Sequence, residues 1–373
     1  AGLRLKKILF VATVAEHFRF FYLPFFEYFK GEGWQVDCAC SSFEEIPGCD
    51  NCHVIPIARS PQNPKNILAL KRVTGLIRNG AYDIIHCNTP VGGVITRIAA
   101  IKQRKLGTKV VYTAHGFHFF NGAPLLNWLI YFPVEKCLSR VTDCLITINQ
   151  EDFLAASRYF KAKNIVQVHG VGYNAEKFFK PLPDIKCELR KKFGYAQDEI
   201  LLVYVAEMNE NKNQKLLIHA FQLVARQQKK ARLLLVGPDR ANGKNQALVN
   251  SLGLADAVRF LGERDDVCEI LPMCDLAVAS SLREGLPVNI MESLACGLPV
   301  VATDNRGHRE LIKNGENGYL VKPDDYAGFA RKVVEIIGNK DLYKQLSANA
   351  SAGVSLYCSG CVLEEMKAVY GGL

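Results

Sequence analysis

The chain has 373 residues, 49% of them hydrophobic, which is long for one domain and sufficient for two buried cores. Because no apolar run approaches the roughly 20 residues of a spanning helix and no secretion signal opens the chain, the sequence predicts a soluble, cytoplasmic protein. Residues 1–175 carry 20 Lys and Arg against 12 Asp and Glu, whereas the remainder carries 26 against 25. Since no nucleic-acid-binding motif accompanies this excess, it predicts either a solvated basic face or an anionic membrane partner, and no nucleic acid.

Strands and helices alternate regularly through the first half. Apolar runs predict strands at residues 7–13, 34–40, 54–57, 83–87, 109–114, 144–148 and 164–169. Helices are expected between them at residues 18–30, 65–79, 92–102, 125–138 and 151–159. Strands that are apolar on both faces, each followed by a helix, indicate a doubly wound parallel sheet with right-handed crossovers.

The second half repeats this pattern after a break. Residues 173–198 are rich in proline and charge and predict a linker with one short helix. A second series of strands is expected at residues 200–206, 231–236, 258–261, 276–279, 300–303 and 318–321. We therefore expect an N-terminal domain at 1–172, a C-terminal domain at 199–350, and a last helix at 351–373 that crosses back to the first domain. Two tandem α/β sheets of this kind place a ligand cleft between their strand carboxyl edges.

The stretch at residues 280–297, SSLREGLPVNIMESLACG, carries two acids on different elements. Glu284 falls in a predicted loop between a buried strand and a helix, and Glu292 falls inside that helix. Pro287 suits the first helical turn, whose free N–H groups suit an anion. The stretch therefore predicts two acids that face one site, beside a helix N-terminus that suits an anion.

Other strand ends in the second half add candidate residues to the same sheet edge. Lys212 follows the strand at 200–206 where a helix begins, the position of a cation that binds phosphate. Gly237 ends the next strand and permits close backbone approach, and residues 262–264 end another. Neither a GxGxxG fingerprint nor a GxxxxGK[ST] P-loop occurs, which argues against a classical dinucleotide site and a P-loop kinase.

Two histidines stand out in the first half. His115 follows the strand at 109–114, and His17 lies in the first strand-to-helix turn, so either could serve a site at the strand edge or be structural. His86 lies inside an apolar strand and is interpreted as structural.

Thirteen cysteines, several in apolar strands, indicate free buried thiols. Two Cys-x-x-Cys pairs, at 49–52 and 358–361, have the spacing of metal ligands. They stand at opposite ends of the chain, so we expect no metal.

The combination of these motifs resembles the family 4 retaining glycosyltransferases of GT-B fold. The resemblance is carried by EGLPVNIMESLACGLPVVAT at 284–303, by Lys212, and by NGYLV at 317–321, and it covers essentially the whole chain. The segments GFHFF at 116–120 and NENKN at 209–213 are similar to the subgroup that builds bacterial capsular and extracellular polysaccharides.

The resemblance implies a role for each matching residue. Glu292 would hold the ribose of a nucleotide sugar, Glu284 would lie near the transferred sugar, and Lys212 would neutralise the leaving diphosphate. His115 would approach the reaction centre. The other residues implied are Gly285, Leu286, Val288, Asn209, Gly237, Glu263 and Arg264 on the donor side, and His17 and Gly116 on the acceptor side.

One departure from the family pattern concerns the phosphate site. Family members have a Gly-Arg pair where this chain has Ala206-Glu207. A glutamate cannot replace a guanidinium. Either Arg283, Arg306 or Arg264 supplies the second cation, or Lys212 and the helix amides suffice.

The expected activity is retaining, metal-independent transfer of a hexose or N-acetylhexosamine from a nucleotide sugar, by family frequency a UDP-sugar. The expected acceptor is a polyprenyl-diphosphate-linked saccharide of polysaccharide biosynthesis, and no cofactor is expected. The alternatives are a sugar-nucleotide epimerase of similar fold, a glycoside hydrolase using the paired acids, and a non-catalytic binding module.

The aromatic segments 18–29 and 119–132 lie in the basic half. Each is either core or part of an interfacial patch that docks on anionic lipid. The second alternative implies a peripheral location at the inner face of the plasma membrane.

Overall fold

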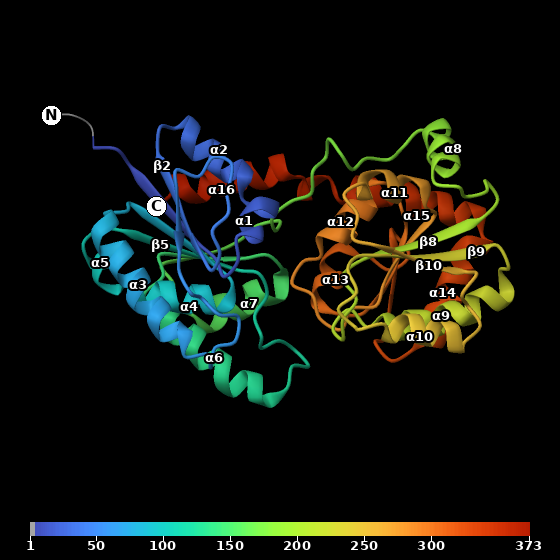
Figure 1. Cartoon of the computed structure of the whole chain (residues 1–373), viewed down its shortest axis with the longest axis horizontal. Helices are drawn as coiled ribbons and strands as arrows, with labels where there is room; N and C mark the ends of the chain where they lie inside the picture. The colour runs from blue at the N-terminus through green and yellow to red at the C-terminus, as the bar shows by residue number, and fades with distance from the viewer. Residues whose placement is uncertain (1–3) are drawn as a thin grey trace. The chain divides into compact units, whose positions relative to one another are not determined.

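The computed structural model describes residues 4–373, which divide into two compact units. Unit 1 comprises the chain up to Val171 together with Ser359–Leu373, and unit 2 comprises Gly172–Cys358. In each unit helices cover both faces of a parallel sheet (Figure 1).

The unit 1 sheet has seven strands in the order β3-β2-β1-β4-β5-β6-β7, and all adjacent pairs are parallel. The central strand β1 is apolar and almost wholly buried, as a strand covered on both faces must be. The strands are β1 (Lys7–Val11), β2 (Gln35–Cys40), β3 (Asn51–Val54), β4 (Ile84–Asn88), β5 (Lys109–Ala114), β6 (Cys144–Thr147) and β7 (Asn164–Gln167).

The helices of unit 1 include the last helix of the chain, α16, in which Tyr370 OH lies 2.6 Å from Nδ1 of the buried His86. The helices are α1 (Glu16–Phe21), α2 (Leu23–Gly31), α3 (Lys65–Gly80), α4 (Pro90–Ala99), α5 (Ile101–Lys105), α6 (Leu125–Ser139), α7 (Gln150–Tyr159) and α16 (Ser359–Gly371).

The unit 2 sheet has six parallel strands in the order β10-β9-β8-β11-β12-β13. They are β8 (Ile200–Val205), β9 (Ala231–Val236), β10 (Val258–Gly262), β11 (Leu276–Ala279), β12 (Val300–Thr303) and β13 (Gly318–Val321). The helices are α8 (Pro183–Lys192), α9 (Gln214–Gln227), α10 (Lys244–Ser251), α11 (Val267–Met273), α12 (Val288–Ala295), α13 (Arg306–Leu311), α14 (Tyr326–Gly338) and α15 (Lys340–Gly353), followed by a 3-10 turn, Ser355–Tyr357.

The short helix expected in the linker, α8, is anchored to unit 2. The buried Arg190 donates hydrogen bonds to Met273 O at 2.9 Å and to Asp275 Oδ2 at 2.6 Å. The predicted doubly wound parallel sheets are confirmed in both halves of the chain.

Several element boundaries differ from the predictions, among them the last helix, which begins at Ser359 and not at residue 351. β3 pairs with β2 from Asn51 to Val54, earlier than the strand predicted at 54–57. Ile55 and Ile57, whose apolar character suggested the later strand, lie beyond this pairing and are buried in the core. The helix expected at 18–30 is divided at Tyr22, and the one expected at 92–102 is divided at Ala100.

The two aromatic segments of unit 1 differ in exposure. In α1 and α2, Phe18, Phe26 and Phe29 are buried, and the Phe26 ring centroid lies 4.8 Å from that of Phe10. The buried aromatic residues of this segment are therefore core, the first of the two alternatives, whereas Phe20 is 76% exposed. The α6 segment instead exposes five large apolar side chains: Leu125, Leu126, Leu129, Ile130 and Val134.

Across residues 4–373, no helix combines the length and the apolar character needed to cross a membrane.

Candidate functional site

Lys212 and Glu284 form an ion pair at the carboxyl edge of the unit 2 sheet. Lys212 Nζ lies 2.6 Å from Glu284 Oε1, and the side chains are 20% and 14% exposed. β8 and β11 are adjacent parallel strands, so the loops that follow them meet at one edge. The fold thus brings together two residues that stand 72 positions apart in the chain.

Hydrogen bonds fix the Lys212 loop against the Glu284 loop. The Leu282 amide donates to Asn211 O at 2.8 Å, and Asn211 Nδ2 donates to Arg283 O at 3.0 Å. Asn209 Oδ1 accepts from the Lys212 amide at 2.9 Å. Asn209, expected on the donor side, therefore shapes the loop that presents the lysine.

Glu292 lies inside α12, as predicted, and its side chain is half-buried. None of the described residues pairs with this carboxylate, and burial raises the pKa of Glu292 to about 7. In the first turn of the same helix, Asn289 Nδ2 donates to Val205 O at 2.8 Å, which ties the start of α12 to the end of β8. An unpaired, partly desolvated carboxylate costs free energy that a ligand bearing hydroxyl groups can offset.

The start of α13 supports the Glu284 loop from a third side. The buried Arg306 donates from Nε to Glu284 O at 3.3 Å. A Cβ on Gly307 would lie 2.7 Å from the Glu284 Cβ, so no side chain fits there without displacing the loop. The residue that caps this helix, Asn305, donates from Nδ2 to Ser281 O at 2.9 Å.

The three arginines proposed as a second cation occupy different environments. Arg306 contacts the backbone of Glu284. Arg264 is exposed and donates to Asp266 Oδ1 at 2.8 Å, and Arg283 is exposed in the loop before Glu284. Glu207, where the family pattern has arginine, is exposed and accepts from Asn209 Nδ2 at 2.8 Å.

The remaining donor-side residues frame the same edge. Gly237 has φ +144°, and a Cβ there would lie 2.2 Å from Ala206 O, so the tight approach of the β9 end to the β8 end requires glycine. Its amide donates to Gly262 O at 2.7 Å, and Glu263 follows as an exposed residue. Gly285, Leu286 and Val288 lead from the Glu284 loop into α12.

Unit 1 places His17 and His115 together at the carboxyl edge of its own sheet. Their ring centroids are 4.7 Å apart with the rings nearly perpendicular, and His115 Nε2 lies 3.2 Å from Asn88 Oδ1. Burial lowers the pKa of His115 to about 4, and burial and the neighbouring histidines lower that of His17. Both rings are neutral at pH 7, so each has one donor and one acceptor nitrogen.

Polar atoms in this cluster lack protein partners. His17 Nε2 and Asn88 Nδ2 are buried, and neither has a hydrogen bond to any described residue. Tyr22 OH donates to Asn88 Oδ1. His86 is structural as expected, since its two nitrogens lie 2.6 Å from Tyr370 OH and 2.8 Å from Thr113 Oγ1. A ligand hydroxyl could satisfy the unpaired atoms of His17 and Asn88.

Sequence reasoning missed Asn88, Tyr22 and Gly307. Asn88 could have been found, because it is a polar residue ending an apolar strand next to the one that precedes His115. Gly307 carried no local signal, since its role appears only when α13 packs against the Glu284 loop.

Family models match both halves of the chain. Residues 186–352 match glycosyl transferases group 1, and residues 7–149 match glycosyl transferase 4-like. The chain is 44% identical over 366 residues to the putative glycosyltransferase EpsD of Bacillus subtilis (strain 168), covering 98% of this chain and 96% of the relative. The chain therefore belongs to the same glycosyltransferase family as this relative.

Two further comparisons extend this assignment. The glycosyltransferase is 26% identical over 284 residues to the UDP-Gal:alpha-D-GlcNAc-diphosphoundecaprenol alpha-1,3-galactosyltransferase of Escherichia coli, covering 74% of this chain and 72% of the relative. The crystal structure of Anabaena Alr3699/HepE in complex with UDP and glucose matches it with a TM-score of 0.80 and 21% identity, covering 99% of this chain and all of that chain. This structural match confirms the predicted GT-B fold.

Proposed function

We propose that this glycosyltransferase transfers a hexose or N-acetylhexosamine from a UDP-sugar to a lipid-linked saccharide in polysaccharide biosynthesis, with retention of the anomeric configuration. The observation that carries the proposal is the donor-side arrangement in unit 2. It combines a cation at Lys212, an unpaired, half-buried carboxylate at Glu292, and the N-terminus of α12, which lies between these two residues in the sequence.

Each group on this edge has a function toward a nucleotide sugar. The Glu292 carboxylate accepts the two ribose hydroxyls, which supply the partners it lacks in the free protein. The N–H groups that begin α12 face the diphosphate, as helix N-termini commonly do. Lys212 turns from Glu284 to the diphosphate, and the released Glu284 carboxylate accepts hydroxyls of the sugar.

The proposed reaction needs no group on the protein to carry the substrate covalently. The bond from the anomeric carbon to the diphosphate oxygen breaks, and the acceptor hydroxyl oxygen bonds to the same face of that carbon. A phosphate oxygen of the leaving diphosphate takes the hydroxyl proton. Lys212, Arg306 and the α12 amides stabilise the charge on the departing diphosphate, the kind of preorganised electrostatic effect that typically contributes most to catalysis.

The acceptor side is assigned to unit 1. His17 and Asn88 offer buried polar atoms without protein partners, and the neutral His115 lies between them in the same cluster. The relative from Escherichia coli carries a diphosphoundecaprenol acceptor in its name. By analogy with that relative we assign a polyprenyl-diphosphate-linked saccharide to this site.

The proposal includes peripheral binding to an anionic membrane surface. The exposed apolar residues of α6 and the net charge of +8 on residues 1–175 favour contact with acidic phospholipid. Co-sedimentation with vesicles of phosphatidylglycerol at low salt is expected to recover protein with the lipid, and less with phosphatidylcholine. Equal recovery with both lipids, or none at any salt, would refute this part.

Donor identity is tested by thermal-shift measurements with a panel of nucleotide sugars, because a ligand that binds only the folded state raises the unfolding midpoint. A UDP-sugar is expected to give the largest rise, and Lys212→Ala to abolish it. The exposed Lys215, in the first turn of α9, provides the matched control, Lys215→Ala, which should retain the shift. A larger rise with a GDP-sugar or an ADP-sugar would show that the donor carries a base other than uracil.

The alternatives predict other products. An epimerase would convert the donor alone into its epimer without any acceptor, whereas transfer requires the acceptor. A glycoside hydrolase would release a free sugar from a glycoside by reaction with water, without any nucleotide-sugar donor. A binding module would show the thermal shift without any turnover.

A further inference from the structure

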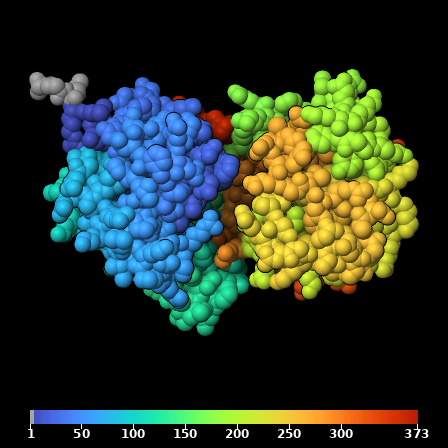
Figure 2. Space-filling model, in the orientation of Figure 1, coloured from blue at the N-terminus to red at the C-terminus, as the bar shows by residue number. Residues whose placement is uncertain are grey.

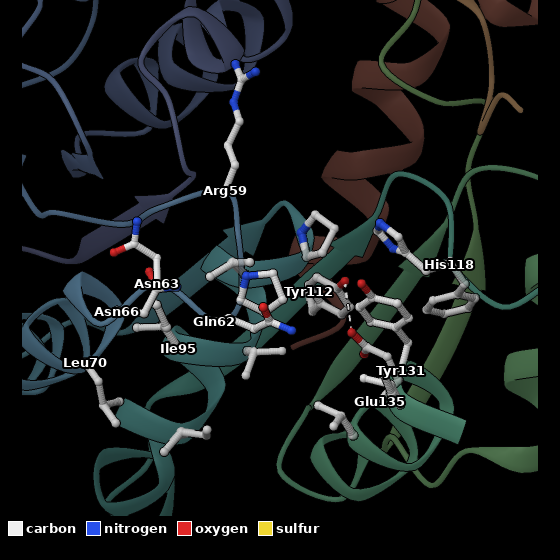
Figure 3. Close-up of a pocket in the computed structure, with 18 of the residues that line it drawn as sticks. Arg59, Gln62, Asn63, Asn66, Leu70, Ile95, Tyr112, His118, Tyr131 and Glu135 are labelled. Atoms are coloured by element: carbon white, nitrogen blue, oxygen red, sulfur yellow. Dashed lines mark hydrogen bonds between the residues drawn. The ribbon is translucent and has the colours of Figure 1, made fainter. Parts of the chain in front are cut away.

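A cavity of about 510 Å³ opens in unit 1 (Figure 3). It is lined by the loop after β3, by α3, α4 and α6, and by the residues that follow His115 in the chain, Gly116 to Phe119. The cavity therefore lies at the same carboxyl edge of the sheet as the proposed acceptor site. Its size falls within the roughly 300–1,000 Å³ of small-molecule sites.

The walls of the cavity are predominantly aliphatic. The lining includes four aliphatic residues that are not exposed, Leu70, Val91, Val94 and Ile95. It also includes four aliphatic residues that are exposed to solvent. Those four are Ile67 at 76%, Ile98 at 40%, Ile130 at 49% and Val134 at 41%. They form an apolar part of the rim, along which a hydrocarbon chain can enter the cavity.

The charged residues of the lining favour an anionic head group over a cationic one. Glu135 is neutralised by the buried Arg97, with 2.8 Å between Arg97 Nη2 and Glu135 Oε2. Arg59, also in the lining, is exposed and pairs with no acid among the described residues. Figure 3 shows Arg59 extending away from the apolar side chains, while Tyr131 and Glu135 lie together elsewhere in the cavity. Because Glu135 is paired with Arg97, Arg59 is the charged residue of the lining that has no ion-pair partner among the described residues.

The rim continues along α6 into a larger apolar surface. Leu125, Leu126 and Leu129 precede Ile130 on this helix and are 73%, 62% and 66% exposed. The segment coloured green-teal, which includes α6, forms a lobe at the periphery of unit 1 (Figure 2). An apolar surface that leads into an apolar cavity suits a ligand that arrives from a membrane.

We propose that this cavity binds the first isoprene units of the lipid carrier, with Arg59 contacting its diphosphate and the attached sugar at the His17 and His115 cluster. This inference rests on the proposed lipid-linked acceptor and adds a specific site for the apolar part of that substrate. The volume admits the beginning of a polyprenyl chain and leaves the rest in the membrane.

Direct binding of farnesyl diphosphate, measured by titration calorimetry below its micelle concentration, tests the inference. Farnesyl diphosphate is expected to bind at least about tenfold more tightly than inorganic pyrophosphate, because apolar burial adds to the charge interaction. Dihexanoyl phosphatidylglycerol is expected to bind more weakly than farnesyl diphosphate. Equal affinity for pyrophosphate and farnesyl diphosphate, or tighter binding of the phospholipid, would overturn the assignment.

Two neighbouring residues of α6 give a matched pair of variants. Ile130→Glu places a charge in the rim and is expected to lower farnesyl diphosphate affinity at least about tenfold. Leu129→Glu adds the same charge to a more exposed position that does not line the cavity, and is expected to leave the affinity unchanged. Both positions are exposed, so both variants should fold, and equal effects of the two would contradict the proposal.

The same variants separate this inference from the proposed function. If Ile130→Glu glycosylates a prenyl-diphosphate-linked sugar as efficiently as the wild type, the cavity assignment fails while the function stands. If the wild type binds farnesyl diphosphate but glycosylates no lipid-linked sugar, the proposed acceptor is wrong while the cavity remains an isoprenoid site.

Discussion

At the scale of single residues, Glu292 should make stability depend on pH. Its pKa of about 7 lies above the ordinary carboxyl value of 4.5, so the folded state binds more protons than the unfolded state between these limits. Stability from this group is therefore lost as pH rises from about 4.5 to 7. Glu292→Gln should be more stable than wild type at pH 8, by about 1–3 kcal/mol.

Urea unfolding of both proteins at pH 5 and pH 8 measures this difference. The difference in unfolding free energy between Glu292→Gln and the wild type should be small at pH 5 and large at pH 8. The exposed Glu316 supplies a control, since Glu316→Gln should leave stability unchanged at both values. A Glu292→Gln variant that is less stable at pH 8 would show that the carboxylate has a structural partner.

Donor binding should depend on the same carboxyl group. If ribose hydroxyls bind the carboxylate, binding favours the deprotonated form, and affinity for UDP-glucose should rise about tenfold from pH 6 to pH 8. UDP-glucose is preferred to UDP as the probe, because a terminal phosphate itself titrates near pH 6. Calorimetry with Glu292→Gln should show weaker binding without this pH dependence, and a variant with the wild-type slope would exclude the role.

At the scale of elements, the packing of α13 on the Glu284 loop should be sensitive to one methyl group. Gly307→Ala places a Cβ 2.7 Å from the Glu284 Cβ, and overpacking of this kind costs about 1–3 kcal/mol. The displaced loop should bind UDP-glucose about tenfold more weakly, since 1.4 kcal/mol is a factor of ten. Gly338, at the end of α14, has open space around its Cα, so Gly338→Ala should retain wild-type affinity. Equal affinities of all three proteins would mean that the loop adjusts freely.

The attachment of α16 to unit 1 should depend on a buried hydrogen bond. Tyr370→Phe removes the donor or acceptor that lies 2.6 Å from His86 Nδ1. Leaving that nitrogen unsatisfied should lower the free energy of unfolding by about 1–3 kcal/mol. Chemical denaturation monitored for unit 1 would show the loss, whereas Tyr326→Phe, at an exposed position, should have no effect.

The elements that could be predicted were those with strong local signals. Lys212 and His115 were identifiable because each follows an apolar strand, and parallel strands bring such positions to one edge. The beginning of β3 was misplaced because Ile55 and Ile57 are apolar for burial and not for pairing. The aromatic residues of α2 and the leucines of α6 have similar hydrophobicity, and only the packing shows that the first are core and the second exposed.

At the scale of the whole molecule, two doubly wound units divide the proposed substrates between them. Unit 2 holds the cation and the unpaired acid suited to a nucleotide sugar, and unit 1 holds the neutral histidines and the apolar cavity suited to a lipid-linked acceptor. The partner of Lys212 and the position of Arg306 could not be predicted, because they depend on contacts between strand-end loops that are distant in sequence.

The most direct measurement combines the protein, a UDP-hexose and a synthetic prenyl-diphosphate-linked N-acetylglucosamine, and determines the new linkage by proton NMR. Reactions with UDP-glucose, UDP-galactose and their N-acetyl forms cover the proposed donors. With an α-linked donor sugar, the account predicts a disaccharide product with an α linkage, formed only when both substrates are present. A β-linked product, or conversion of the donor to its epimer without transfer, would contradict it.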